Sequence, residues 1–586
     1  MNTYLERIKN LRSEMTLAEV DVYIVPTADY HASEYVADHF KTRQYLSGFS
    51  GSNGTLVVTQ YDAALFTDGR YFIQAEEELK GSDIVLMKMG ESGVPKIEDY
   101  ICDSLSKGET VGYDGKTMPF DFGNALREKL KNKDINFKID LDLAGRIWKD
   151  RPEIPCEKTW ILPYKYSGED TAYKINRIRE KLIDLGADGI LISALDDIAW
   201  VFNIRGNDIE YTPVTLSFAI ITDTKAYIYI DKEKITSEVE KSFEENGIIV
   251  RSYDSVYDDV KTFPGTLFVD PSSANEKLAR NVSDVKFGLS PIAEAKCIKN
   301  DIELDNIKKA HLNDAVALTK TIYWIKKLSE SAAIFRETEL SVSEHLLMER
   351  KKISDFLSLS FESIVASNEH GAIIHYEPTE KTNKVIDSGM LLIDSGGQYK
   401  TGTTDVTRTI SIKEPDFEMK RFYTAVLKGH LDLGMATFDV DYPTPKLDEI
   451  ARKPIRDRGQ DYNHGTGHGV GYILSVHEGP TGFRKEESSK DYPFKRHMVV
   501  SNEPGVYLKD KFGIRIENMM YVRGLANRLR FDTLTLVPYD KASINIDELT
   551  FEELEELRWY SEKVYTMLSP HLTDEEKMWL REETIY

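Results

Sequence analysis

The sequence predicts a multidomain protein of the α/β and α+β classes, with two related amino-terminal α/β domains before a larger domain that carries the chemistry. The chain has 586 residues, which is more than one hydrophobic core serves. Two stretches of the first half repeat one order of helix, strand and turn. Histidines and paired acids concentrate in the second half, between positions 370 and 520. We therefore expect domains at residues 1–155, 156–300 and 301–586.

The repeat consists of an amphipathic helix, a buried strand, a glycine-bearing turn and two further strands. The first copy reads "RIKNLRSEM", "VDVYIVP", "YLSGFSGSNGTLVVT" and "AALFTDGRY". The second copy reads "KINRIREKL", "GADGILIS", "WVFNIRGNDIEYTPVTLSFAIIT" and "KAYIYID". The proline-bearing segment Lys149–Pro163 lies between the copies and is predicted to be a linker. The order predicts two α/β domains of one plan.

Composition excludes several classes of protein. The formal net charge of −23 argues against nucleic acid as the main partner, because phosphate binding needs basic patches. The only cysteines are far apart and outside any CxxC pattern: Cys102, Cys156 and Cys297. Neither a disulfide framework nor a thiolate metal site is indicated. No apolar run reaches the roughly 18 residues of a membrane span, and the start has no apolar core of a signal peptide. We expect a cytoplasmic protein without a membrane partner.

The third domain opens with a long helical pattern, "NDIELDNIKKAHLNDAVALTKTIYWIKKL", whose first turn is acidic. Beyond it, "LLIDSGGQYKTGTTDVTRTI" is predicted to form a β-hairpin that turns near Tyr399 and Lys400. Asp394 and Asp405 then occupy mirror positions about the turn. Like charges facing each other across a ladder are destabilising, so a bound cation is the simplest compensation.

A second hairpin, "VVSNEPGVYLKDKFGIRIENMMYV", turns near Asp510 and places Glu503 and Glu517 at mirror positions. The two acidic hairpins resemble duplicated halves. We therefore expect the domain to fold as two related α/β halves around one cleft, with all four carboxylates brought together. Four carboxylates and an imidazole are enough to hold two divalent cations bridged by shared carboxylates.

The imidazole is predicted to come from "HGTGHGVG", His464 to Gly471, which lies between the hairpins in the sequence. Its four glycines disfavour a helix and favour a loop or strand end at which the backbone approaches another segment closely. The pattern alone leaves open whether His464 or His468 is the ligand.

The ordered set of motifs resembles that of the pita-bread metallopeptidases. The motifs are "HYEP", "DSGGQY", "GTTDVTRT", "HGTGHGVG", "VHEGP", "NEPGVY" and "RIEN". With "YLSGFSGSNGT", "FTDGRY" and "ALDDIAWVFNIRGNDIEYTPV", the chain closely resembles the long, three-domain aminopeptidase P, or Xaa-Pro aminopeptidase, family over nearly its full length. The resemblance implies two creatinase/prolidase-type amino-terminal domains, a pita-bread catalytic domain with a helical tail, and release of the first residue from peptides with proline second.

Carried over by position, the resemblance implies five metal ligands: Asp394, Asp405, His468, Glu503 and Glu517. It selects His468 over His464 and implies that Asp405 and Glu517 bridge the two ions. It also implies that Glu503 acts as the general base. Three histidines are implied to line the substrate cleft: His375 on the leaving side, His464 beside the proline ring, and His477 at the oxyanion.

The oxygen-rich ligand set is compatible with manganese, cobalt or zinc, and the resemblance favours manganese. It also implies a homodimer. One alternative is a prolidase, which shares the ligands but cleaves Xaa-Pro dipeptides; the duplicated amino-terminal half and the long tail argue against it. A methionine aminopeptidase would not need two preceding α/β domains. A non-catalytic peptide-binding relative is the alternative from another class, but all five ligand positions carry ligand-competent residues.

Overall fold

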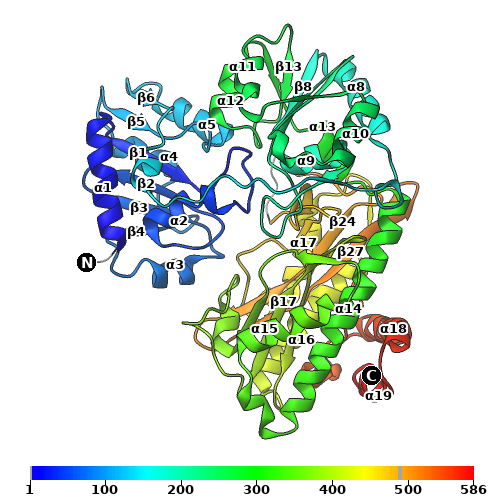
Figure 1. Ribbon diagram of the computed structural model, residues 1–586. Coiled ribbons are helices and arrows are strands. Elements are labelled where there is room, and N and C mark those ends of the chain that lie inside the picture. Colours follow the sequence, from blue (N-terminus) through cyan, green and yellow to red (C-terminus); the bar gives the residue numbers. More distant parts are fainter. Residues whose placement is uncertain (1–2, 486–490) are drawn as a thin grey trace. The chain divides into compact units, whose positions relative to one another are not determined.

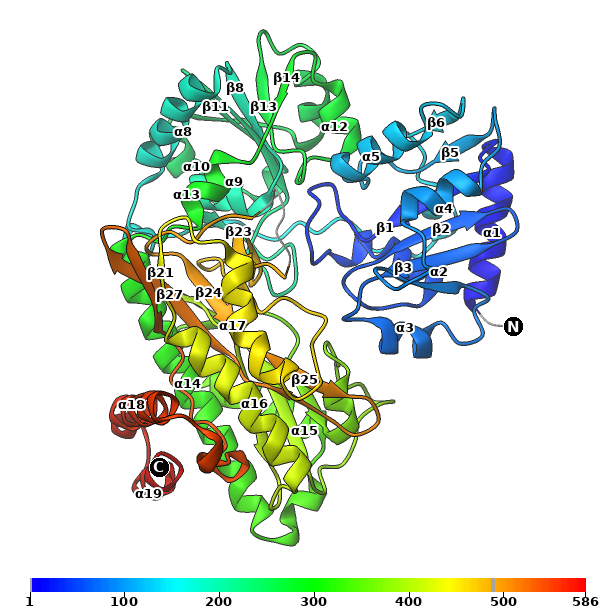
Figure 2. The same cartoon turned by 180° about the vertical axis from the view of Figure 1, so that it is seen from behind.

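The computed structural model describes residues 3–485 and 491–586, and the chain forms two compact units. The first unit comprises residues 1–164 and 169–294, and the second comprises residues 165–168 and 295–586. Figures 1 and 2 label the elements of each unit from opposite sides.

The first half of unit 1 is a six-stranded sheet in the order β4-β3-β2-β1-β5-β6. Its strands are β1 (Val22–Pro26), β2 (Thr55–Thr59), β3 (Ala63–Thr67), β4 (Val85–Lys88), β5 (Thr110–Gly112) and β6 (Asn136–Lys138). Its helices are α1 (Thr3–Leu17), α2 (Thr42–Ser47), α3 (Phe72–Glu78), α4 (Ile97–Asp103), α5 (Phe120–Leu130) and α6 (Leu143–Ile147).

Alternate residues of the central strand enter two different cores. Tyr23 of β1 packs with Leu11 of α1, whereas Ile24 packs with Ile101 of α4 and Leu126 of α5. Successive side chains of a strand point to opposite faces, so helices cover both faces of this sheet.

The second half of unit 1 repeats this plan in the order β12-β11-β10-β8-β13-β14. Its strands are β8 (Gly189–Ile192), β10 (Ser217–Thr222), β11 (Ala226–Ile230), β12 (Ile248–Arg251), β13 (Leu267–Val269) and β14 (Val285–Phe287). Its helices include α8 (Thr171–Leu185), α9 (Leu195–Val201), α10 (Ser237–Glu245), α11 (Val256–Asp259) and α12 (Glu276–Asn281). β8 pairs antiparallel with β10 and parallel with β13, as β1 pairs with β2 and β5. The predicted repeat of two α/β domains is confirmed.

The segment between the two sheets contains little regular structure. Within Lys149–Pro163 only β7 (Trp160–Ile161) is a strand, and it pairs with β9 (Ile204–Arg205). α7 (Tyr164–Ser167) follows, and α13 (Pro291–Lys296) leads into unit 2.

Unit 2 contains two halves of similar order, in which two helices precede most of the strands. The first half comprises α14 (Asp301–Ser329), α15 (Glu339–Lys351), β15 (Phe356–Leu359), β16 (Ile364–Ser367), β17 (Met390–Ser395), β18 (Gly397–Tyr399), β19 (Gly402–Thr403) and β20 (Val406–Ser411). The second half comprises α16 (Phe417–Gly434), β21 (Thr437–Asp439), α17 (Thr444–Arg456), β22 (Gly467–Gly469), β23 (Glu478–Phe483), β24 (Val499–Asn502), β25 (Gly505–Leu508), β26 (Phe512–Arg515), β27 (Asn518–Leu525) and β28 (Arg528–Thr533). The tail comprises α18 (Phe551–Leu568) and α19 (Asp574–Glu583).

The two halves share one core. Leu318 of α14, Leu391 of β17, Val426 of α16 and Ile514 of β26 belong to a single buried cluster. α16 and α17 lie side by side against the strands (Figure 2). The long helix begins as predicted, because the Asn300 side chain caps the backbone of Glu303 and the Glu303 side chain returns to Asn300 in a capping box. The expectation of two α/β halves is met. Among the described residues, no helix has the length and apolar character that a membrane crossing requires.

Candidate metal centre

The five predicted ligands come from strand ends of both halves of unit 2. Asp394 lies near the end of β17 and Asp405 directly before β20. His468 is the middle residue of β22, Glu503 follows β24, and Glu517 lies between β26 and β27. Thr407 of the first half donates its hydroxyl hydrogen to Glu517 Oε2 of the second at 2.7 Å, so the two acidic hairpins meet.

The first hairpin differs in register from the prediction. β17 pairs with β20 so that Asp394 faces Thr407, and Asp405 is offset by two residues. The tip of the hairpin, β18 and β19, leaves this sheet and pairs with β15 instead, which shifts the centre of the turn. Asp394 and Asp405 are therefore not directly opposite across the ladder. Tertiary pairing with β15, which local spacing does not encode, decided the register.

The second hairpin has the predicted register. Gly505 faces Arg515 in the β25–β26 pair and Asn502 faces Asn518 in the β24–β27 pair. Both pairs are symmetric about residue 510, where Asp510 has a positive φ of 62°. Glu503 and Glu517 accordingly occupy mirror positions.

Three of the predicted ligands offer atoms that all lie within 4.8 Å of one another: Asp405, His468 and Glu517. His468 Nε2 is 3.5 Å from Asp405 Oδ2 and 3.4 Å from Glu503 Oε1. Nδ1 of the same ring lies 3.0 Å from the Gly469 carbonyl oxygen, which can only accept. The Nδ1–H is therefore used by the backbone, and Nε2 is the nitrogen that faces the carboxylates.

His464 is engaged differently. Its Nδ1 lies 2.7 Å from the Gly465 carbonyl oxygen and its Nε2 lies 2.7 Å from the Tyr507 hydroxyl. Both ring nitrogens thus have hydrogen-bond partners within the chain. This geometry favours His468 over His464 as the ligand, which the sequence pattern alone left open.

Two buried carboxylate oxygens fit a cation. Asp394 Oδ1 and Glu517 Oε1 have no hydrogen-bond partner among the described residues. Burial raises the pKa of Glu517 well above its usual value, and the charges of Asp405 and Glu503 raise it further. Burial also raises the pKa of Asp394 to about 6, against an opposing effect of Arg515. A buried carboxylate oxygen without a donor is costly, and divalent cations supply the missing partner.

Protein cations offset only part of the negative charge. Arg515 Nη2 lies 2.5 Å from Asp394 Oδ2, and Arg515 Nη1 lies 2.8 Å from the Tyr507 hydroxyl. Burial alone would lower the pKa of His468, but hydrogen bonding to Asp405 and the charge of Glu503 raise it to about 9. The Arg515 guanidinium and the His468 imidazole together do not balance the charge of the four acids, so the residues present fit a pair of divalent ions.

The glycines around His468 have a steric reason. A Cβ on Gly467 would lie 1.9 Å from the Ser501 carbonyl oxygen, and one on Gly469 would lie 2.3 Å from the Glu478 carbonyl oxygen. β22 is therefore pressed between β23 and β24 and can present only the His468 ring. The predicted close backbone approach is confirmed.

Two of the predicted substrate histidines lie beside the ligands. The His477 ring centroid is 4.3 Å from that of His468, and His464 Nδ1 is 3.9 Å from Glu503 Oε2. His375 follows the short 3-10 helix η5 (Asn368–Ala372) and is partly exposed. η5 packs on β26, where Gly371 closely approaches Gly513. The backbone thus brings the His375 segment to the second hairpin, while the role of its ring stays a prediction.

Sequence reasoning missed Arg515 and Thr407, which hold Asp394 and Glu517. Strand alternation was the available signal, because Arg515 and Glu517 are two residues apart in "GIRIEN", as are Asp405 and Thr407 in "TTDVTRT". Residues at that spacing share a face of a strand.

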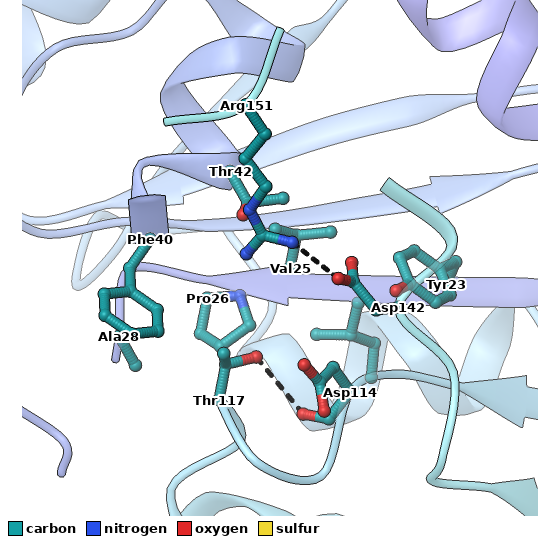
Figure 3. A pocket seen from close by; sticks show the side chains of 11 residues that line it. Tyr23, Val25, Pro26, Ala28, Phe40, Thr42, Asp114, Thr117, Asp142 and Arg151 are labelled. Carbon is teal, nitrogen blue, oxygen red and sulfur yellow. Dashed lines mark hydrogen bonds and ion pairs between the residues drawn. The ribbon is translucent and has the colours of Figure 1, made fainter. Parts of the chain in front are cut away.

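A separate pocket in unit 1 contains none of the predicted site residues. It lies beside the ends of β1 and β5 and is lined by Tyr23, Pro26, Phe40, Asp114, Asp142 and Arg151, among others (Figure 3). Its polar groups are used within the chain: Asp142 pairs with Arg151 at 2.5 Å, and Asp114 accepts from the Lys116 backbone N–H at 2.9 Å.

Comparison with known families gives matches along nearly the whole chain. The Creatinase/Prolidase N-terminal domain matches residues 7–142 and, in a second family description, residues 150–303. Metallopeptidase family M24 matches residues 305–524, and the C-terminal region of peptidase M24 matches residues 527–585.

Full-length relatives include Aminopeptidase P2 of Arabidopsis thaliana, which is 38% identical over 98% of this chain and 87% of its own. Xaa-Pro aminopeptidase 1 of Dictyostelium discoideum is 37% identical over 96% of this chain and 93% of its own. The crystal structure of the X-prolyl aminopeptidase from Caenorhabditis elegans, described as a cytosolic enzyme with a di-nuclear active site, superimposes with a TM-score of 0.95 at 32% identity, covering 100% of both chains. The Xaa-Pro dipeptidase from Bacillus anthracis shares the fold over 63% of this chain, at a TM-score of 0.52 and 24% identity.

Proposed function

We propose that this protein, which belongs to the long, three-domain aminopeptidase P branch of metallopeptidase family M24, is a metal-dependent aminopeptidase that releases the first residue of peptides with proline second. The observation that carries this function is the convergence of two acidic hairpins and His468 on one buried cluster with two unpartnered carboxylate oxygens. Prolidase activity is less well supported, because the similarity to the dipeptidase covers only 63% of this chain.

The site is proposed to bind two divalent ions, with Mn²⁺ preferred and Co²⁺ or Zn²⁺ as alternatives. Five residues would hold the ions: Asp394, Asp405, His468, Glu503 and Glu517, and the family resemblance implies that Asp405 and Glu517 would be shared between them. The mutual proximity of Asp405, His468 and Glu517 supports this assignment. The oxygen-rich donor set is compatible with all three metals, and the family resemblance favours manganese. When bound, such a pair of ions lowers the pKa of a water molecule and polarises the scissile carbonyl.

The chain's own groups then move the protons. A carboxylate oxygen of Glu503 accepts the proton of the attacking water and passes it to the nitrogen of the leaving proline. Burial raises the pKa of Glu503, which suits a group that must hold a proton during the reaction. His477, beside His468, donates to the oxygen of the tetrahedral carbon.

Proline makes particular demands on such a site. An Xaa-Pro nitrogen has no N–H and the ring fixes φ, so an active site cannot orient the bond through that amide. His464 borders the space for the proline ring and His375 holds the peptide on the leaving side. Binding energy from the ring helps to place the scissile carbonyl.

Four further properties are part of the proposal. The domains comprise residues 1–155, 156–300 and 301–586, which the separate sheets support. The protein acts in the cytosol, as described for the Caenorhabditis elegans enzyme, and its three cysteines are free. It forms a homodimer, an expectation from the family resemblance. The substrates are oligopeptides with a free amino end, not nucleic acids or membranes.

The test uses purified protein, stripped of metal and reloaded with Mn²⁺, Co²⁺ or Zn²⁺ in parallel. We expect rapid release of arginine from Arg-Pro-Pro, and at least tenfold less from Arg-Ala-Pro, from acetylated Arg-Pro-Pro and from the dipeptide Arg-Pro. Equal cleavage of the acetylated peptide would contradict an aminopeptidase. A clear preference for the dipeptide would replace the proposal with a prolidase.

A further inference from the structure

A buried carboxylate outside the metal centre organises the segment that carries His375. Glu339 is the first residue of α15, and its side chain is fully buried. Oε1 accepts from the Ser367 backbone N–H at 2.8 Å and lies 2.8 Å from His370 Nδ1. Oε2 accepts from the Tyr376 hydroxyl at 2.8 Å and from the Lys384 backbone N–H at 3.0 Å. One carboxylate therefore binds four groups.

These four partners span residues 367–384, which connect β16 to the approach to β17. Ser367 is the start of the segment, Lys384 is its end, and Tyr376 is the neighbour of His375. The backbone of Glu339 contacts the end of the segment as well, because its N–H donates to the Lys384 carbonyl oxygen at 3.0 Å. The carboxylate thus joins both ends and the middle of one long connection.

The opposite side of the segment is held by the second hairpin. A Cβ on Gly513 would lie 1.7 Å from the Gly371 carbonyl oxygen, so β26 and η5 are in backbone contact. In the sequence, His375 lies between Gly371, which makes this contact, and Tyr376. The backbone that carries His375 is therefore held at two points, by the hairpin that carries Glu503 and Glu517 and by the Glu339 carboxylate.

The surroundings of the Glu339 side chain favour a hydrogen-bond acceptor at this place. Glu339 lies in the first turn of a 13-residue helix, where the helix dipole favours negative charge. Burial, together with Glu339, raises the pKa of Tyr376, so the phenol remains a donor. A carboxylate with its lone pairs filled by donors is stable in the interior, whereas one without donors is costly.

We propose that Glu339 is a positioning residue for His375, acting by closing segment 367–384 through its contacts to Ser367, His370, Tyr376 and Lys384. The inference rests on the proposed function, which places His375 at the peptide. In this proposal Glu339 does not contact the substrate and acts by fixing the position of His375.

Glu339→Gln tests the positioning role. The glutamine side chain has nearly the same shape, but its NH₂ group replaces one carboxylate oxygen and would face groups that themselves donate hydrogen bonds. We expect faster amide hydrogen exchange across residues 367–384 and a loss of at least tenfold in kcat/KM, with metal content unchanged. In a His375→Ala background the same substitution should cost less than threefold, because the two residues act as one unit. Glu339→Asp should restore part of the activity.

Tyr376→Phe is the milder variant if Glu339→Gln does not fold, since it removes a single donor; a loss of threefold or more is expected. Asp540→Asn is the matched control. Asp540 is an equally buried carboxylate whose donors are Ser411, Ser543 and Lys326, none of them within residues 367–384. It should lower Tm without changing kcat/KM.

The outcomes separate the two proposals. Unchanged exchange and activity in both Glu339→Gln and Tyr376→Phe would overturn the positioning role while the proposed function stands. The positioning role would also be overturned if Glu339→Gln reduced kcat/KM in the His375→Ala background as much as it does in the wild type. Wild-type activity of His375→Ala would overturn the role of His375 and the positioning role together.

Discussion

The two acidic hairpins of unit 2 present the predicted carboxylate ligands through different registers. In the first, the tip joins another sheet and Asp394 faces Thr407; in the second, Glu503 and Glu517 are in mirror positions about residue 510. Each hairpin also holds an acid of the other. Arg515 of the second binds Asp394 of the first, and Thr407 of the first binds Glu517 of the second.

This exchange shows that the site does not depend on strict symmetry within a hairpin. Its geometry comes from contacts between the hairpins, in which one side chain orients a ligand from the other half of the domain. Such outer partners fix the rotamers of ligands and contribute to metal affinity.

The largest effect is expected when a ligand of the first hairpin is changed without changing its shape. Asp405→Asn should reduce kcat by about a thousandfold or more, because a neutral amide is a poor bridge between two cations. Circular dichroism should show an intact fold, and metal analysis should show less than two ions per chain. The exposed Asp439→Asn is the control and should behave as wild type. Near-normal turnover with full metal content would remove Asp405 from the bridging position.

The contacts between the hairpins predict an intermediate effect. Arg515→Lys keeps the charge but loses the fork that reaches both Asp394 and Tyr507. We expect metal affinity to fall by about 10- to 100-fold, measured by calorimetry. Thr407→Val should weaken it less, since only one neutral donor is lost, and Thr407→Ser should be close to wild type. If Arg515→Lys bound metal as tightly as the wild type, the contact from Arg515 of the second hairpin would not be needed to orient Asp394 of the first.

The smallest effect concerns the metal-free protein and its pH dependence. Burial raises the pKa of Asp394 from its ordinary value of 3.8 to about 6, and the pKa of Glu517 is also raised. A group whose pKa is higher in the folded state contributes stability below its unfolded pKa and loses it as the pH rises through the folded value. The Tm of metal-free protein should therefore fall as pH rises from about 4 through 6.

Saturating Mn²⁺ should abolish most of this dependence, because the bound ions favour the ionised carboxylates. Differential scanning fluorimetry across this pH range, with and without Mn²⁺, measures both curves. A metal-free Tm that rises steadily over the same range would show that the folded protein does not raise the pKa values of Asp394 and Glu517.

Much of the fold followed from local pattern. The helix at residues 171–185 and the strands after it could be recognised as a copy of the first domain, because burial on one face imposes a period in the sequence. The "HGTGHGVG" loop was recognisable for a similar reason, since Gly467 and Gly469 leave no room for a Cβ where β22 lies between its neighbouring strands. The acids were recognisable because each of two predicted hairpins places a pair of like charges at mirror positions, which a bound cation would compensate.

The sequence by itself thus determined the domain plan, the four acids and the strand that presents a histidine. The tertiary structure decided the register of the first hairpin, the contacts of Arg515 and Thr407 to the acids and, outside the candidate metal centre, the contacts of Glu339. Its hydrogen bonds favour His468 over His464 as the predicted ligand. Local periodicity records which face of an element is buried, and it extends only over neighbouring residues. Contacts such as Thr407 to Glu517 or Glu339 to Lys384 join residues far apart in the chain, and only the packed core sets the distance between them.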